Sequence, residues 1–123
     1  MNKDILQAQK TFIEECLKQN EQGFFDPLKQ KEWSSLMALG MICEVAEFIE
    51  AYNPFPWKKE SIGHDRDEHV KEEIVDILFF LLEMCLLWGI DQEEVLKNLY
   101  ERKLKVNYER GQVHEKPNPE GNL

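Results

Sequence analysis

Cysteine is scarce in this sequence, and the few cysteines that occur form no recognisable metal-binding pattern. Cys16, Cys43 and Cys85 stand far apart, with no CxxC pair and no Cys/His cluster, so a structural zinc site is not expected. Each lies in an apolar helical stretch, and we expect all three to be buried, reduced thiols of a cytoplasmic protein. The polar first residues, MNKDILQAQK, do not resemble a signal peptide.

Positive charge and long apolar runs are scarce as well. The chain has 24 acidic residues against 15 Lys and Arg, which gives a net charge of −9. Such a charge repels nucleic acid and anionic membranes, so neither is an expected partner, and an anionic substrate would need a cation between itself and the protein. The apolar run from Ile74 to Ile90 contains Asp76 and Glu83, and it is too short and too charged for a membrane span.

No segment alternates convincingly between apolar and polar residues with a period of two, which leaves helical periodicity and an all-α fold. We expect a four-helix bundle-like unit. A chain of 123 residues predicts one domain, here residues 1–112, followed by a flexible tail at 113–123. The expected helices run from Asp4 to about Asn20, from Ser34 or Ser35 to Tyr52, from Asp67 or Glu68 to Trp88 with Gly89 as its cap, and from Asp91, in a capping box with Glu94, to Gly111.

Two pairs of acids stand on consecutive predicted helices. Glu44 and Glu47 form the first pair, and Glu73 and Asp76 form the second. Positions three apart lie roughly 60° apart around a helix, so each pair points to one side. The helix that carries the second pair is apolar over most of its circumference, and we expect it to be buried in a bundle or at a subunit interface. Glu50 is expected to be an ordinary surface acid.

Carboxylates in such a setting need a partner. A carboxylate in apolar surroundings is costly unless it is neutralised or paired, and four acids from two adjacent helices would also repel one another. A divalent cation resolves both problems, and Mg²⁺ prefers hard oxygen ligands while keeping waters and substrate phosphates in its shell. The sequence therefore favours a carboxylate metal site. The alternatives are a solvated acidic face, or acids paired with bases of a partner subunit such as Arg66 or Arg102.

The order Glu44-x-x-Glu47, a connecting loop and then Glu73-x-x-Asp76 resembles the signature of the all-α nucleoside triphosphate pyrophosphohydrolases. These include the MazG-like proteins and the dimeric dUTPases, and the resemblance covers about residues 33–112. It implies that the four acids bind Mg²⁺, for which Mn²⁺ can substitute. It also implies cleavage of a nucleoside triphosphate to the monophosphate and pyrophosphate. Glu47 is the expected catalytic residue, which would orient or deprotonate the attacking water.

Two further stretches, PWKKE and YERKLKVNYERGQ, are similar to the dUTPase branch in particular. The resemblance implies substrate binding by Trp57, Lys58, Tyr100, Lys103, Asn107 and Arg110. We expect Lys58, Lys103 and Arg110 to meet the phosphates. Trp57, together with Phe55, would stack on the base or close over the site as part of a mobile loop. The alternatives are solvated surface bases and a tryptophan that packs against the bundle. His69 is expected either at the edge of the acidic site or as a surface histidine.

The expected function is that of a nucleotide-pool enzyme, a Mg²⁺-dependent pyrophosphohydrolase with dUTP among its candidate substrates. Two alternatives remain open, a broad MazG-like enzyme without dUTP preference and a non-catalytic helical interaction module. The apolar surface of the helix that carries Glu73 is too extensive for one unit of this size to cover, which predicts a homodimer. The resemblance implies dimers or dimers of dimers.

Overall fold

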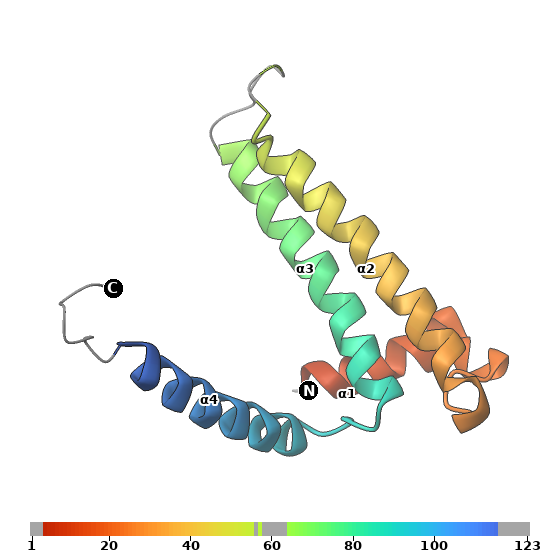
Figure 1. The fold of residues 1–123 in the computed structure, drawn as a ribbon. Coiled ribbons are helices and arrows are strands. Elements are labelled where there is room, and N and C mark those ends of the chain that lie inside the picture. The colour runs from red at the N-terminus through yellow and green to blue at the C-terminus, as the bar shows by residue number, and fades with distance from the viewer. Residues whose placement is uncertain (1–3, 56, 58–63, 116–123) are drawn as a thin grey trace. The chain divides into compact units, whose positions relative to one another are not determined.

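The computed structural model describes residues 4–55, 57 and 64–115. In this part of the chain it contains four α-helices and no strand (Figure 1), so the predicted all-α fold is confirmed. The helices form two compact units, Met1–Asp91 and Gln92–Leu123. The first unit holds α1, α2 and α3, and the second holds α4. The single domain expected for residues 1–112 stays a prediction.

The N-terminal helix is shorter than its periodicity suggests. As predicted, Asp4 caps α1 (Ile5–Phe12), because its side chain accepts a hydrogen bond from the backbone N–H of Gln7 at 2.7 Å. The helix then widens into a π-helical turn at Ile13–Leu17 and stops at Lys18, which has a left-handed backbone with φ of 53°. The prediction of one continuous helix to Asn20 is therefore wrong, because a left-handed residue ends the helical path.

Helix α2 (Gln30–Tyr52) begins earlier than predicted. After a 3₁₀ turn at Gln19–Gln22, a second one at Pro27–Lys29 is capped by Asp26, whose side chain accepts from the N–H of Leu28 at 3.0 Å. The fixed backbone φ of proline suits the first turn of a helix, and this 3₁₀ turn leads directly into α2. The start expected after Ser34 or Ser35 is therefore wrong, whereas the end at Tyr52 is confirmed.

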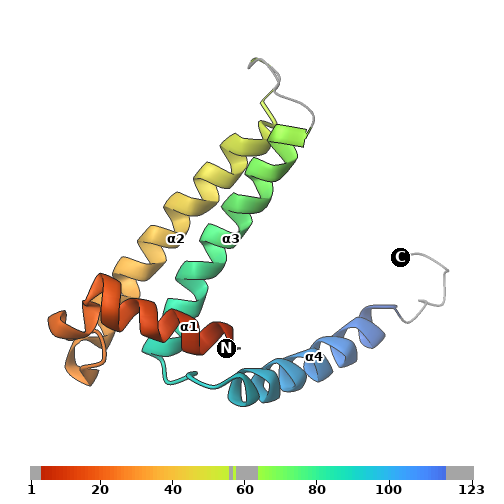
Figure 2. The same ribbon diagram turned by 180° about the vertical axis from the view of Figure 1, so that it is seen from behind.

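Helix α3 (His64–Leu87) returns alongside α2 in the opposite direction (Figure 1, Figure 2). Its predicted start at Asp67 or Glu68 is a few residues late, but its predicted stop is confirmed. Gly89 has φ of 81°, its N–H donates to the carbonyl of Leu86, and the N–H of Ile90 donates to the carbonyl of Cys85. These two bonds form a Schellman cap, which requires the left-handed conformation that glycine adopts most easily.

Side chains join the N-terminal end of α2 to the C-terminal end of α3. The indole N–H of Trp88 donates to Ser34 Oγ at 2.8 Å, and the Gln30 amide donates to the carbonyl of Leu87 at 3.1 Å. Farther along the pair, the ring of Phe80 lies directly against the backbone at Gly40. The two helices are therefore held together close to one end, with a tight contact farther along.

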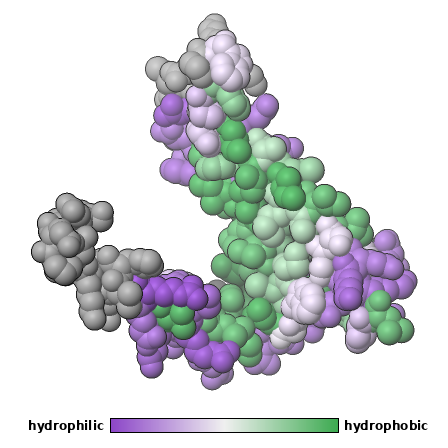
Figure 3. Space-filling model, viewed as in Figure 1, coloured by the Kyte–Doolittle hydropathy of each residue, from purple (hydrophilic) through white to green (hydrophobic). Residues whose placement is uncertain are grey.

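The buried core of the first unit is small. Its apolar members are Leu6, Ile13, Phe24, Met37, Leu82, Leu86 and Leu87. Much of α3 stays uncovered, since Ile74, Val75 and Phe79 are about half exposed, and Figure 3 shows apolar residues gathered over the α2–α3 pair. The prediction that the cysteines are buried is wrong for Cys16 and Cys43, which are exposed, because the apolar stripes on which they lie are themselves only partly covered.

The second unit is the single helix α4 (Glu93–Glu115). Its first hydrogen bond runs from the N–H of Leu96 to the carbonyl of Gln92, so the helix opens one residue later than a cap at Asp91 predicts. It continues past Gly111 to Glu115, and the first residues of the expected tail are therefore helical. None of the helices in the described residues has the length and apolar character of a membrane span.

Candidate functional site

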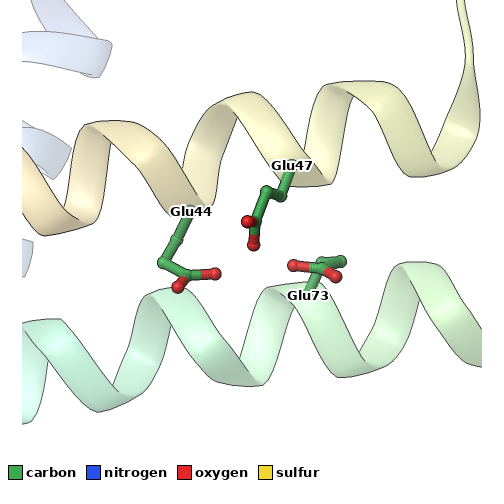
Figure 4. Close-up of side chains that lie close together, drawn as sticks. All are labelled: Glu44, Glu47 and Glu73. Atoms are coloured by element: carbon green, nitrogen blue, oxygen red, sulfur yellow. The ribbon is translucent and has the colours of Figure 1, made fainter.

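Three of the predicted metal ligands meet between α2 and α3. Glu44 and Glu47 project from α2 and Glu73 projects from α3, and their carboxylates turn toward one another (Figure 4). One oxygen from each side chain lies within 4.8 Å of the others. The spacing of three residues explains the pair on α2, because it places both side chains on one side of the helix. The antiparallel pairing with α3 brings Glu73 to the same place.

The three carboxylates differ in exposure. The side chain of Glu73 is largely buried, with 8% of the residue exposed, Glu44 is half-buried and Glu47 is exposed. Oε2 of Glu44 and Oε2 of Glu73 are buried and have no hydrogen-bond partner among the described residues. Buried acceptors without a donor are uncommon in proteins, so these two oxygens indicate a missing positively charged or proton-donating group.

The pKa values of Glu44 and Glu73 are also consistent with a missing positively charged group. Burial is the largest cause that raises the pKa of Glu44, followed by a hydrogen bond with Glu47 and by repulsion from Glu47, Asp76 and Glu73. Burial also raises the pKa of Glu73, and the charges of Glu47 and Asp76 add to it, while nearby His69 acts in the opposite direction. Both acids therefore hold their protons more tightly than a solvated carboxyl does, and a bound cation would relieve the repulsion that causes part of this effect.

Asp76, the fourth predicted ligand, lies beside the cluster rather than in it. Its oxygens are not in the group that Glu44, Glu47 and Glu73 form, yet its charge raises the pKa of both Glu44 and Glu73. The residue is half-buried and lines a shallow hollow on α3 together with Lys71. Its role as a metal ligand stays a prediction.

Two residues that the sequence analysis gave little weight lie next to the cluster. A hollow of about 520 Å³ is lined by Ala46, Glu47, Glu50, His69 and Glu73. Nε2 of His69 lies 3.8 Å from Oε1 of Glu73, and its side chain is more than half exposed, so His69 is a surface histidine that stands at the edge of the acidic site. Glu50 was expected to be an ordinary surface acid. The sequence signal for the position of Glu50 beside the cluster was its place in the series Glu44, Glu47 and Glu50, at a spacing of three.

The residues present fit a divalent cation of the hard type. Three carboxylates supply oxygen ligands, and two of their oxygens are buried without a donor. Mg²⁺ is bound in proteins by one or two carboxylates, with waters and substrate phosphates in its remaining positions. Glu47 is the exposed member of the cluster, so its carboxylate is accessible to solvent. The donor set thus fits a hard divalent cation and contains three of the four predicted ligands.

The predicted substrate-binding residues lie apart from these acids in the sequence. Trp57 is 75% exposed, and its ring lies against that of Phe55, with 5.2 Å between the ring centroids. Lys58 lies outside the described residues. The others belong to the second unit, where they are exposed on α4 at successive spacings of three, four and three: Tyr100, Lys103, Asn107 and Arg110. This spacing puts the four on one face of that helix.

A comparison with known protein families gives a match over most of the chain. A family model described as dUTPase matches residues 3–113, and no curated protein and no solved structure matches the chain significantly. The matched range includes all the acids of the cluster, all four α-helices almost to their ends, and the predicted substrate-binding residues. The protein therefore belongs to this dUTPase family and is an all-α nucleotide hydrolase.

Proposed function

We propose that the protein is a Mg²⁺-dependent nucleoside triphosphate pyrophosphohydrolase, with dUTP as its first candidate substrate. It would release the monophosphate and pyrophosphate as a cytoplasmic enzyme of the nucleotide pool. The observation that carries this proposal is the cluster of Glu44, Glu47 and Glu73, in which two buried carboxylate oxygens lack a donor. Membership of the dUTPase family supports the reaction type.

Charge explains why such a protein needs a metal. A nucleoside triphosphate carries about four negative charges near neutral pH, and the chain carries a net charge of −9. Glu44, Glu47, Glu73 and Asp76 would hold Mg²⁺, or Mn²⁺ in its place. The ion supplies an electrostatic bridge to the phosphates and lowers the pKa of bound water. Without it, the same four acids would repel the substrate.

The remaining roles fall to exposed side chains. Glu47 has the exposed carboxylate of the cluster and would orient the attacking water or take its proton. Lys58, Lys103 and Arg110 would contact phosphate oxygens, with Arg110 suited to bidentate contact. Trp57, which exposes most of its ring, would stack on the base. Tyr100 and Asn107 would contact the sugar or the base edge.

A panel of nucleotides tests the proposal. Purified protein is incubated with each common NTP and dNTP and with dUTP, once with Mg²⁺ and once with excess EDTA, and pyrophosphate is measured. We expect pyrophosphate and the monophosphate in equal amounts, with Mg²⁺ only. Activity confined to dUTP would select the dUTPase reaction, and activity on many substrates would select a broad MazG-like enzyme. If no nucleotide yields pyrophosphate, the chain is a non-catalytic helical module and the proposal is wrong.

Removing the exposed carboxylate tests the assignment of the catalytic residue. Glu47→Gln keeps the size of the side chain but removes its charge, and we expect kcat to fall by roughly 10² to 10⁴-fold, as for loss of a general base. Glu32→Gln is the matched control, because Glu32 is an exposed acid on the same helix, near its start. Unchanged turnover in a Glu47→Gln variant with wild-type helical content would contradict the role of Glu47.

The same enzyme is proposed to be a homodimer or a dimer of dimers. Support comes from α3, on which Ile74, Val75, Leu78, Phe79 and Leu81 are all more than one-third exposed. A soluble monomer rarely leaves so contiguous an apolar face uncovered. Light scattering coupled to size-exclusion chromatography should give at least twice the 14.6 kDa chain mass. A monomer at micromolar concentration would refute this part of the proposal.

A further inference from the structure

A buried polar contact joins α1 to α3 within the first unit. Glu83 of α3 and Gln9 of α1 are only 6% and 3% exposed, and Nε2 of Gln9 donates a hydrogen bond to Oε1 of Glu83 at 3.3 Å. Glu83 lies seven residues beyond Asp76, and the acids of the cluster are not among the causes that shift its pKa. The carboxyl is therefore a buried ionisable group for which the proposed reaction has no use.

Two acceptor atoms at this contact lack a donor. Oε2 of Glu83 and Oε1 of Gln19 are both buried without a hydrogen-bond partner among the described residues, although the Gln19 amide lies within hydrogen-bonding range of the Glu83 carboxyl. Gln19 opens the 3₁₀ turn that follows α1 and its π-helical turn. A proton on Oε2 would be the donor that Gln19 Oε1 lacks, after a half-turn of the amide group. One proton can thus satisfy both oxygens.

A negative charge on Glu83 has little to compensate it. Burial raises the pKa of Glu83, and hydrogen bonds from Gln19 and Gln9 lower it by less. These two side chains, which meet the carboxyl from the 3₁₀ turn and from α1, are uncharged, and no acid or base of α1, α2 or the turns contributes to the shift within the described residues. A buried charge without an ionic partner is costly, so the neutral carboxyl stabilises the contact between α1 and α3 more than the charged one.

We propose that Glu83 is a pH-dependent switch: its neutral form holds α1 and the following 3₁₀ turn against α3, and its ionisation loosens this N-terminal segment. Helix α1 lies across α3 (Figure 2), and their contact is much less extensive than the contact between α2 and α3. Elements with few contacts open locally before the whole unit unfolds. The two helices also line a hollow of about 450 Å³ that is apolar apart from Gln9. The protonation state of Glu83 thus controls how well α1 covers the apolar face of α3.

Hydrogen exchange of the full-length protein at a series of pH values tests the proposal. Mass spectrometry gives the exchange rates of peptides from α1, each corrected for the rate of an unstructured chain at the same pH. Protection of α1 should be constant below the ordinary pKa of 4.5, fall as the pH rises toward the raised pKa of the folded state, and level off above it. We expect a total loss of protection of about threefold or more, at no more than about tenfold per pH unit, since one proton is involved.

Glu83→Gln imitates the neutral carboxyl at every pH, because its amide can donate to Gln19 and accept from Gln9. In this variant the protection of α1 should not change with pH. Glu15→Gln is the matched control, since Glu15 is an exposed acid in the same N-terminal segment, and it should keep the pH dependence of the wild type. Burial also raises the pKa of Glu44 and Glu73, but these acids are present in all three proteins.

Two outcomes would overturn the inference. The first is a wild-type protein in which the corrected protection of α1 stays the same across the pH series, and this result needs no variant. The second is a Glu83→Gln protein that retains the pH dependence of the wild type, because another group would then be responsible. Neither outcome bears on the metal site or on the proposed hydrolase reaction.

Discussion

The contact between Gly40 and Phe80 sets how closely α2 and α3 approach beside the acidic cluster. A Cβ atom added at Gly40 would lie 2.3 Å from Cε1 and 2.7 Å from Cζ of the Phe80 ring. Non-bonded carbons are normally about 3.5 to 4.0 Å apart, so Gly40→Ala forces either the ring or a whole helix to move by more than about 1 Å. Overpacking of this kind costs up to about 3 kcal/mol.

The substitution also stabilises the helix, and this partly offsets the cost of the clash. Alanine favours a helix interior over glycine by about 1 kcal/mol, so the net loss in the free energy of unfolding should be about 2 kcal/mol. Gly40 precedes Glu44 by one helical turn, and any separation of the helices there moves Glu44 away from Glu73. Divalent-metal affinity should therefore fall together with stability in the Gly40→Ala variant.

Urea denaturation followed by circular dichroism, with EDTA present, measures the effect on stability. The same substitution is made in a Phe80→Leu background, where the ring that causes the clash is gone, and there Gly40→Ala should be neutral or stabilising. Gly111→Ala is the control, because a Cβ atom at that helical glycine meets nothing within 4 Å, and it should stabilise by about 0.5 to 1 kcal/mol. Equal effects of Gly40→Ala in the two backgrounds would refute the reasoning.

Three further changes test other contacts of the first unit. Burial raises the pKa of Glu83, which accepts a hydrogen bond from Gln9 Nε2 at 3.3 Å. Relative to Glu83→Gln, wild-type stability should therefore fall as pH rises from about the ordinary value of 4.5 through the raised pKa of the folded state, and below 4.5 the difference should not change with pH. A pH-independent difference in urea midpoints would show that this burial has no effect. Gly89→Ala places a side chain at φ of 81° and should cost about 1 to 2 kcal/mol, and a wild-type midpoint would argue against the cap. Ser34→Ala removes the acceptor of the Trp88 indole, and a loss of about 1 kcal/mol is expected by urea denaturation followed by tryptophan fluorescence.

Features that depend on local sequence were predicted well. The Asp4 cap, the stop at Gly89 and the matched faces of Glu44 and Glu47 each follow from residues a few positions apart, and the structure confirms them. The grouping of Glu73 with the acids of α2 also followed, because its burial in an apolar helix required a partner.

Features that depend on contacts between distant residues were not predicted. The register between α2 and α3 decides that His69 borders the hollow while Asp76 stays outside the carboxylate group, and no local pattern contains this register. The exposure of Cys16 and Cys43 likewise depends on which apolar helix faces are covered by another element of the fold. The early start of α2 is a miss of another kind, because Asp26 as a cap and Pro27 at the first helical position are a local signal that the sequence already contains.

The pairing of α2 with α3 has a consequence for the order of folding. The two helices are consecutive in the chain, so closing the segment between them costs little entropy, and local contacts of this kind form quickly. The three carboxylates come together as soon as this hairpin closes, before α1 is required. The repulsion among the carboxylates opposes that closure, and a bound divalent cation would add its binding free energy to the stability of the hairpin. Cation concentration would thus act on the rate at which the chain folds as well as on the folded enzyme.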